Sequence, residues 1–248
     1  PESGDGGVIC VIDNMELLQT SAHARRILEE LRDTLLTLPG LRFVFSGATG
    51  ITLTVGTSPR LEGYVHQPLE IHEIDRNDAE HILRSRIDAY AYFPEEAYLP
   101  IRGSDFKNLY TILRGNLRST LGHVDDYCMW VSDRKAPEGD RERSRHFAEW
   151  FEELTNRSYS AAKHALRPRA WEVFEAATDI GGEFSQSDYE IFGFNSIAAM
   201  RPHIRDLETN GMLISSQDDT DKRRKTVTVT PKGWIVAHAR IRDLPRKG

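Results

Sequence analysis

The stretch Gly7-Val8-Ile9-Cys10-Val11-Ile12-Asp13-Asn14 decides how the first part of this chain is interpreted. Its five consecutive apolar residues, most of them β-branched, predict a strand that is buried on both faces, as in a parallel sheet. An acid follows the strand directly, and α/β sheets bind ligands at the carboxyl ends of their strands. Asp13 is therefore a candidate ligand-binding residue, although an Asp that simply begins a turn is an equally good interpretation.

The residues that follow predict a strand–helix–strand unit. From about Ala22 to Leu38, apolar side chains recur at helical spacing and charged side chains fill the other face. Pro39-Gly40 ends this helix, and Leu41–Gly47 predicts a second buried strand that ends in a small polar residue. A right-handed βαβ crossover is the default for such a unit. Leu69–His72 offers a third, shorter strand.

Composition indicates a globular protein with two different parts. The net charge of −6 over 248 residues divides unevenly: residues 1–159 carry 18 basic against 26 acidic side chains, and residues 160–248 carry 14 against 12. No apolar run is long enough to span a membrane and no signal peptide is evident, so we expect a cytoplasmic protein in which Cys10 and Cys128 are buried free thiols. The chain begins with Pro1 rather than Met, so we expect it to be a fragment of a longer protein.

Four short motifs occur in a recognisable order: Ile12-Asp13-Asn14, Phe45-Ser46-Gly47, Ser58-Pro59-Arg60-Leu61 and Leu113-Arg114-Gly115-Asn116-Leu117-Arg118. Over residues 7–130 this order resembles the C-terminal part of an AAA+ ATPase, and it is most similar to the origin-initiator branch and related prokaryotic ATPases. In that family the four elements are Walker B, sensor 1, an arginine-finger region and the sensor 2 of a helical lid.

The resemblance implies roles for the residues after the first two strands. Asp13 would hold Mg²⁺ through water, and Ser46 would be the sensor-1 group near the γ-phosphate, with Thr49 as the alternative. Asn14 stands where the family usually has a Glu that orients the attacking water. An amide can orient water but cannot accept its proton, so hydrolysis is expected to be slow or absent.

Two arginines are candidates for contacting phosphate. Gly115-Asn116 predicts a turn and a helix cap, which places Arg118 in the first turn of a helix, where the dipole favours phosphate. A solvated helix residue is the alternative interpretation. Arg60 would be the arginine finger, but an ordinary loop residue is the better interpretation, since Glu62-Gly63 replaces the family's usual following Arg.

The phosphate loop of such ATPases has no counterpart here, because no G-x-x-x-x-G-K-[ST] motif occurs in the chain. In the family this loop precedes Walker B, so it would lie upstream of Pro1. We therefore expect ATP and Mg²⁺ to act as cofactors only when the upstream loop is present, and this fragment alone to be inactive.

The last part of the sequence predicts a winged helix-turn-helix. Residues 133–142 have the composition of a linker, and a connecting helix follows from Arg143. Within residues 168–242, three short helical segments precede two strands with a charged tip between them, and Thr230-Pro231 begins a final helix. Helices followed by a two-stranded wing are a DNA-binding architecture.

The wing, residues 210–233, closely resembles that of MarR-type regulators. By that resemblance Arg223, Arg224 and Lys225 would lie along a minor groove or phosphates, although solvated charge at a hairpin tip is the alternative. On the recognition segment, Arg201 and Arg205 suit phosphates or guanine edges. Pro202 lies in the expected helix interior, where it removes a hydrogen bond, so backbone binding is favoured over sequence reading.

The predicted fold is α/β, a partial P-loop NTPase sheet plus a helical lid, with a C-terminal winged helix of the α+β class. The expected domains are residues 1–72 (half of the AAA+-like core), 73–132 (lid), 133–166 (linker and connecting helix) and 167–248 (winged helix). The leading function is control of double-stranded DNA binding by nucleotide state, without membrane association. Either a protein partner or self-assembly through the ATPase module is open as a further interaction. The alternative is a degenerate ATPase scaffold whose winged helix binds a protein partner.

Overall fold

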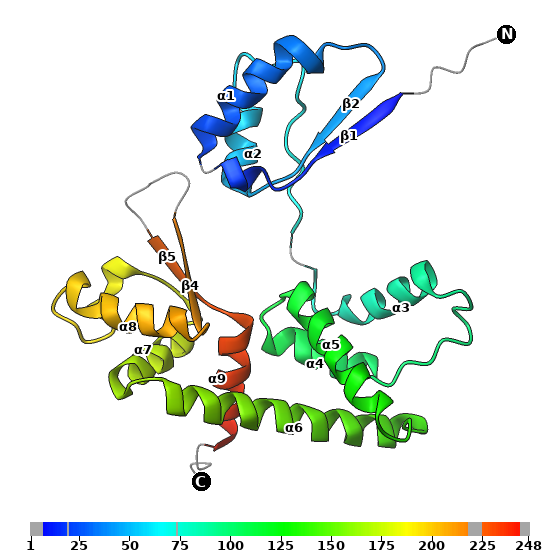
Figure 1. Ribbon diagram of the computed structural model, residues 1–248, viewed down its shortest axis with the longest axis vertical. Coiled ribbons are helices and arrows are strands. Elements are labelled where there is room, and N and C mark those ends of the chain that lie inside the picture. The colour runs from blue at the N-terminus through cyan, green and yellow to red at the C-terminus, as the bar shows by residue number, and fades with distance from the viewer. Residues whose placement is uncertain (1–6, 19, 73, 218–224, 244–248) are drawn as a thin grey trace. The chain divides into compact units, whose positions relative to one another are not determined.

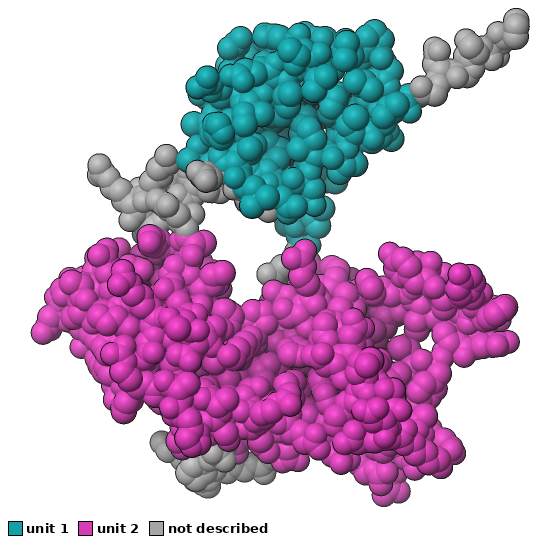
Figure 2. All heavy atoms as spheres, viewed as in Figure 1, with its two compact units in different colours: residues 1–72, 217–223 teal, residues 73–216, 224–248 magenta. Residues whose placement is uncertain are grey.

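A computed structural model describes residues 7–18, 20–72, 74–217 and 225–243 of the chain. The chain divides into two compact units, residues 1–72 with 217–223 and residues 73–216 with 224–248, which Figure 2 shows in different colours. The first unit has one small hydrophobic core, and the second has two larger ones.

The first unit is built on a parallel pair of strands joined through a helix (Figure 1). Its elements, in chain order, are β1 (Val8–Ile12), η1 (Met15–Leu18), α1 (Ser21–Leu31), the π-helical η2 (Arg32–Leu36), β2 (Leu41–Phe45) and α2 (Thr49–Gly56). The Thr20 side chain caps α1 by accepting a hydrogen bond from the His23 amide. Gly40, with φ of +79°, makes the turn into β2. The predicted strand–helix–strand unit is confirmed.

Burial of β1 on both faces was expected, and that expectation is wrong. Val8, Ile9 and Val11 expose 57%, 68% and 67% of their surface, and Cys10 between them is only half-buried. The core of this unit lies instead among α1, α2 and the turn after α2, and its buried members are Met15, Ala24, Leu28, Ile51, Val55 and Leu61. A strand is buried on both faces only where helices or further strands cover it, and the described part of this unit covers β1 incompletely.

The predicted third strand at Leu69–His72 does not form. These residues have no regular secondary structure, and Leu69 and Ile71 expose 90% and 91% of their surface. A strand forms only when a neighbour takes up its backbone hydrogen bonds. Among the described residues, the parallel sheet contains β1 and β2 alone.

The second unit begins with a helical bundle of α3 (Ala79–Tyr90), α4 (Gly103–Ile112), α5 (Leu117–Ser132) and α6 (Gly139–Ala165). Residues 139–142, expected in a linker, form the first turn of α6. The bundle core gathers large aromatic side chains, among them Phe106, Tyr110, Tyr127 and Trp150. Cys128 is a free thiol that is half-buried rather than buried, and burial raises its pKa.

A winged helix completes the second unit. It consists of α7 (Pro168–Asp179), β3 (Glu183–Ser185), the 3₁₀ turn η3 (Gln186–Asp188), α8 (Ile197–Thr209), β4 (Leu213–Gln217), β5 (Lys225–Val229) and α9 (Pro231–Asp243). The three strands form one sheet in the order β3-β5-β4, with β3 antiparallel to β5. Two of the three predicted short helical segments, the wing strands and the Thr230-Pro231 helix start are present. β3 was not predicted, and the segment from Ser187 is a 3₁₀ turn followed by further turns rather than an α-helix.

The chain is mostly helical, with a small parallel sheet near its start and an antiparallel sheet near its end. None of the helices among the described residues is both long enough and apolar enough to cross a membrane.

Candidate functional sites

Asp13 and Ser46 lie side by side at the carboxyl ends of β1 and β2. The backbone ladder continues past both strands: the Ser46 amide donates to the Ile12 carbonyl at 3.0 Å, and the Ser46 carbonyl accepts from the Met15 amide at 3.1 Å. This alignment brings the Ser46 hydroxyl within hydrogen-bonding reach of Asp13 Oδ1, to which it donates. Two residues 33 positions apart in sequence thus form one polar group at the end of a parallel sheet.

Asn14 forms the turn out of β1. Its φ is +59°, in the left-handed region that Asn tolerates better than most residues, and its amide donates to Asp13 Oδ1 at 2.8 Å. Its carbonyl accepts from the Leu17 amide and so begins η1. The local reason for an Asn here is therefore backbone geometry, and its role in orienting water stays a prediction.

Asp13 and Ser46 carry oxygen atoms of the kind that can bind magnesium. A carboxylate and a hydroxyl are the hard oxygen donors that Mg²⁺ accepts. Among the described residues, no group of three or more His, Cys, Asp or Glu side chains could hold a metal ion. Asp13 and Ser46 together offer such an ion one carboxylate and one hydroxyl group.

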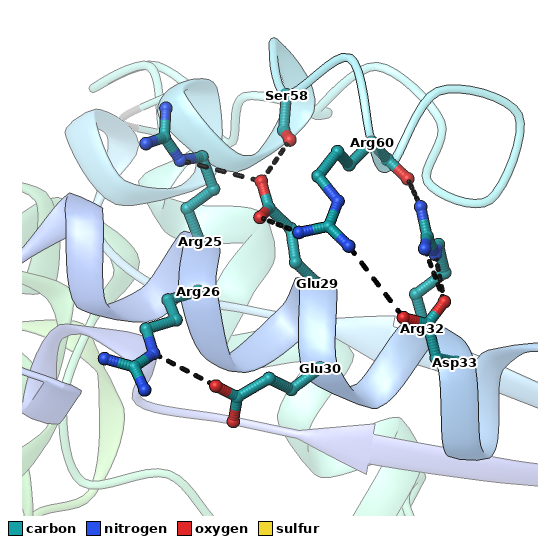
Figure 3. A network of polar contacts seen from close by, with 8 residues as sticks. All are labelled: Arg25, Arg26, Glu29, Glu30, Arg32, Asp33, Ser58 and Arg60. Atoms are coloured by element: carbon teal, nitrogen blue, oxygen red, sulfur yellow. Dashed lines mark hydrogen bonds and ion pairs between the residues drawn. The ribbon is translucent and has the colours of Figure 1, made fainter.

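Arg60 belongs to a network of ion pairs on the surface of α1 (Figure 3). Its guanidinium lies 3.4 Å from Glu29 and 4.0 Å from Asp33, and its carbonyl accepts from Arg32 Nη1 at 2.8 Å. Ser58, two residues earlier and buried, donates to Glu29 Oε1 at 2.8 Å. The loop that carries Arg60 is thereby tied to α1, which is a structural role that the motif did not predict.

Arg118 occupies the position that the sequence predicts for it in its helix. Gly115, with φ of +80°, makes the turn, and the Asn116 side chain accepts from the Ser119 amide at the start of α5. Arg118 is the second residue of α5 and is exposed. Within the described part of the chain its guanidinium has neither an ion pair nor a hydrogen bond. Asp13 and Arg118 belong to different units, so their convergence on one cleft stays a prediction.

The exposed face of α8 carries two unpaired cations. Ala198, Ala199, Arg201, Pro202 and Arg205 are exposed, whereas His203, which the sequence also predicts at an outward position, is half-buried. Neither arginine on this face forms an ion pair or a side-chain hydrogen bond with the rest of the described chain. Lys225, the first residue of β5, is exposed as well. Arg223 and Arg224 lie outside the described residues, as does the side chain of Thr49.

Pro202 stands inside α8, which continues from Ile197 to Thr209 across it. The Pro202 carbonyl accepts from Arg167 Nη2 at 3.2 Å, and Arg167 Nε donates to Asp206 at 3.0 Å. Arg167 therefore connects the start of α7 to α8 at Pro202 and, one turn later, at Asp206. Nearby His203 is half-buried, and burial together with the positive charges of Arg167 and Arg169 lowers its pKa.

Contacts between distant segments were missed at the sequence level. The clearest is the stack of Arg114 on Trp234 of α9, in which the guanidinium carbon lies 4.3 Å from the ring centroid. The two residues are 120 positions apart, and no periodicity or motif relates them. The sequence signal at this position was that Arg114 precedes a glycine and a helix cap; the structure adds that Arg114 has a φ of +54°.

Comparison with known proteins finds similarity among solved structures but not among family profiles or curated sequences. No protein-family profile matches the chain, and no curated protein sequence matches it. Among solved structures, the chain is similar to the Orc1 protein of Aeropyrum pernix, determined in complex with DNA, with a TM-score of 0.43 and 15% sequence identity. The similarity covers 95% of this chain and 64% of the other, so the chain spans less than two thirds of that protein's length.

Proposed function

We propose that this chain is the C-terminal part of an AAA+-like ATPase whose nucleotide state controls the binding of double-stranded DNA by the winged helix. The single observation that carries the DNA-binding half is the exposed face of α8, where Arg201 and Arg205 have no ion-pair partner among the described residues. An arginine without an internal partner retains its whole charge for phosphate.

The shape of the winged helix supports the same proposal. Lys225 begins the second wing strand, and the wing tip adds Arg223 and Arg224 in the sequence. The α8 face and the wing are the two parts of this architecture that contact the grooves and the backbone of DNA. With Pro202 and two alanines on α8, contacts to the phosphate backbone are favoured over the reading of bases.

The nucleotide half of the proposal is supported by the contact between Asp13 and Ser46. In this proposal the Asp13 carboxylate holds Mg²⁺ through water, Ser46 senses the γ-phosphate, and Arg118 and Arg60 contact phosphate charge. Bound Mg²⁺ would supply charge neutralisation at the phosphates. The phosphates themselves would be held by a loop that the sequence lacks, and Asn14 makes hydrolysis slow.

The DNA-binding half is tested by the salt dependence of affinity. Replacing Arg223, Arg224 and Lys225 with Ala should weaken binding to duplex DNA and lower the slope of log K against log salt by about 2–3, at roughly 0.9 per phosphate contact. The control replaces Lys135, Arg141 and Arg145, which are exposed on or near the start of α6, and changes net charge equally. If both triple variants lower the slope alike, the wing contributes only general charge.

The nucleotide half is tested by calorimetry with Mg·ATP. The chain of 248 residues should show little or no binding even at millimolar nucleotide, and the full-length protein should bind. In the full-length protein Asp13→Ala or Arg118→Ala should weaken binding or abolish hydrolysis, and Asn14→Glu should accelerate hydrolysis. Tight binding of ATP by this chain alone would contradict the assignment of the phosphates to an absent loop.

Two observations favour a second function, that of a scaffold with a degenerate ATPase part and a winged helix that binds protein. Arg60 is paired with Glu29 and Asp33 of its own unit, and Asn14 is explained by its backbone turn. A scaffold of this kind would show no salt-dependent DNA binding and no nucleotide binding at full length. The two assays above therefore separate the two functions.

A further inference from the structure

Helix α9 is shared by the two cores of the second unit. Trp234, Val236 and Ala237 are buried in the core of the winged helix, whereas Ile235 is buried in the core of the helical bundle. Ion pairs continue the same division, since Arg240 pairs with Asp179 of α7 and Arg242 with Glu152 of α6. A displacement of α9 must therefore act on both cores.

The start of α9 also supports the DNA-binding elements. Thr230 directly follows β5, and its hydroxyl donates to the Gly211 carbonyl at 2.6 Å while accepting from the Gly233 amide at 3.0 Å. Lys232 Nζ donates to the Asn210 carbonyl at 2.8 Å. Gly211 and Asn210 form the turn between α8 and β4. One helical turn thus fixes the second wing strand and the end of α8.

The Arg114–Trp234 stack connects this turn to the start of α5. Arg114 lies four residues before Arg118, in the turn that leads to Asn116, the N-cap of α5. The Trp234 ring is also packed against Gly182, where a Cβ atom would collide with it, and the Gly182 carbonyl accepts from the Val229 amide of β5. The ring therefore contacts the turn before α5 on the bundle side and the wing sheet on the other.

A cavity lies where α5, α6 and the start of α9 meet. It has a volume of about 460 Å³ and is lined by Ser119 and His123 of α5, Ser158 of α6, and Thr230 and Lys232 at the start of α9. Packed interiors resist displacement because they contain few voids. The space between α5 and the start of α9 is therefore incompletely filled, although Ile235 of α9 still packs into the bundle core.

We propose that the Arg114–Trp234 stack transmits the state of the α5 N-terminus to the wing and to α8, with Arg114 as a positioning residue. The inference rests on the proposed function. Engagement of Arg118 by phosphate displaces the start of α5, the stack carries this displacement to Trp234, and α9 passes it to the wing. Coupling between sites is reciprocal, so DNA at the wing must also alter the start of α5.

The test uses the full-length protein and reads the start of α5 directly. Hydrogen exchange of a peptide covering residues 113–121 should change about fivefold or more when duplex DNA binds, in the range typical of coupled sites. Arg114→Ala should abolish that change, and Arg114→Lys, which keeps the charge but stacks less well, should reduce it. Arg134→Ala is the matched control, since Arg134 stacks on Trp130 at 3.6 Å on the bundle surface.

Nucleotide supplies the second readout. The ratio of DNA affinities with and without Mg·ATP should fall to within about twofold of unity in Arg114→Ala and stay at the wild-type value in Arg134→Ala. An exchange response to DNA that persists in Arg114→Ala, or that is absent from the wild type, overturns the proposal. If DNA binds and nucleotide does not, the nucleotide half of the proposed function fails, and the stack is judged on the exchange response alone.

Discussion

The two sheets of this protein have similar apolar strands and very different surroundings. In β5, Val227 and Val229 are buried at 0% and 4% exposure, whereas in β1, Val8 and Val11 expose more than half of their surface. In the winged helix, helices that lie within about 75 residues of one another in sequence cover the sheet and complete the hydrophobic core. The comparison shows that the burial of a strand depends on what covers it and not on its own hydrophobicity.

The largest difference is expected between two glycines that have similar positive φ angles but different surroundings. Gly182 in the winged helix has φ of +91° and would collide with Trp234 if it carried a Cβ, whereas Gly63 in the first unit has φ of +81° and open space around it. Gly182→Ala should lower the free energy of unfolding by about 4 kcal/mol, from backbone strain and overpacking together. Gly63→Ala should lower it by only about 1 kcal/mol.

The unfolding of each unit is measured with a separate probe. All four tryptophans of the chain lie in residues 130–234, so fluorescence during denaturation reports the second unit, and hydrogen exchange reports the first. Equal losses of stability in the two variants would mean that Trp234 does not pack against Gly182.

Matched valine substitutions test the difference in burial between the two sheets most directly. Val227→Thr places a hydroxyl in a site with 0% exposure and should cost about 1–3 kcal/mol of unfolding free energy. Val11→Thr, at 67% exposure, should change it by less than about 0.5 kcal/mol. Denaturant midpoints and exchange rates of each variant check this. A large loss in Val11→Thr would show that β1 is covered in solution.

Helix caps should behave alike in both units, because a cap acts locally. Thr20 caps α1 in the first unit and Asn116 caps α5 in the second, each by accepting from an amide three residues on. Replacing either with Ala should cost about 1 kcal/mol. The expected equality is measured by the same denaturation and exchange experiments. A much larger loss in one helix would indicate that its cap holds tertiary structure as well.

The smallest expected effect is a pH dependence confined to the second unit. Burial lowers the pKa of His123, partly offset by Asp126 at 3.7 Å, and burial with Arg242 lowers that of His238. The folded state then binds fewer protons than the unfolded state, so stability is highest above pH 6.5 and falls as the pH drops below it. His123→Gln should flatten this dependence between pH 7 and pH 5, whereas His81→Gln, at an exposed site, should leave it unchanged.

Most local features of the fold could be predicted from the sequence. The strand–helix–strand order, the Asn116 cap, and the alternating strand with its Thr230-Pro231 helix start each depend on neighbouring residues, whose propensities act within one turn or one strand. The sequence placed Asp13 and Ser46 at the ends of two strands but did not predict their contact, which follows from the parallel pairing of β1 and β2. β3 was missed because three residues carry too short a pattern.

What only the tertiary structure decided concerns segments far apart in the chain. The exposure of β1, the pairing of Arg60 with Glu29 and the stack of Arg114 on Trp234 depend on which surfaces meet. The sequence by itself determined the order and most of the starts of the longer helices and strands, because those preferences are local. Burial and long-range ion pairs are set by the packing of distant elements, and no short-range pattern encodes that packing.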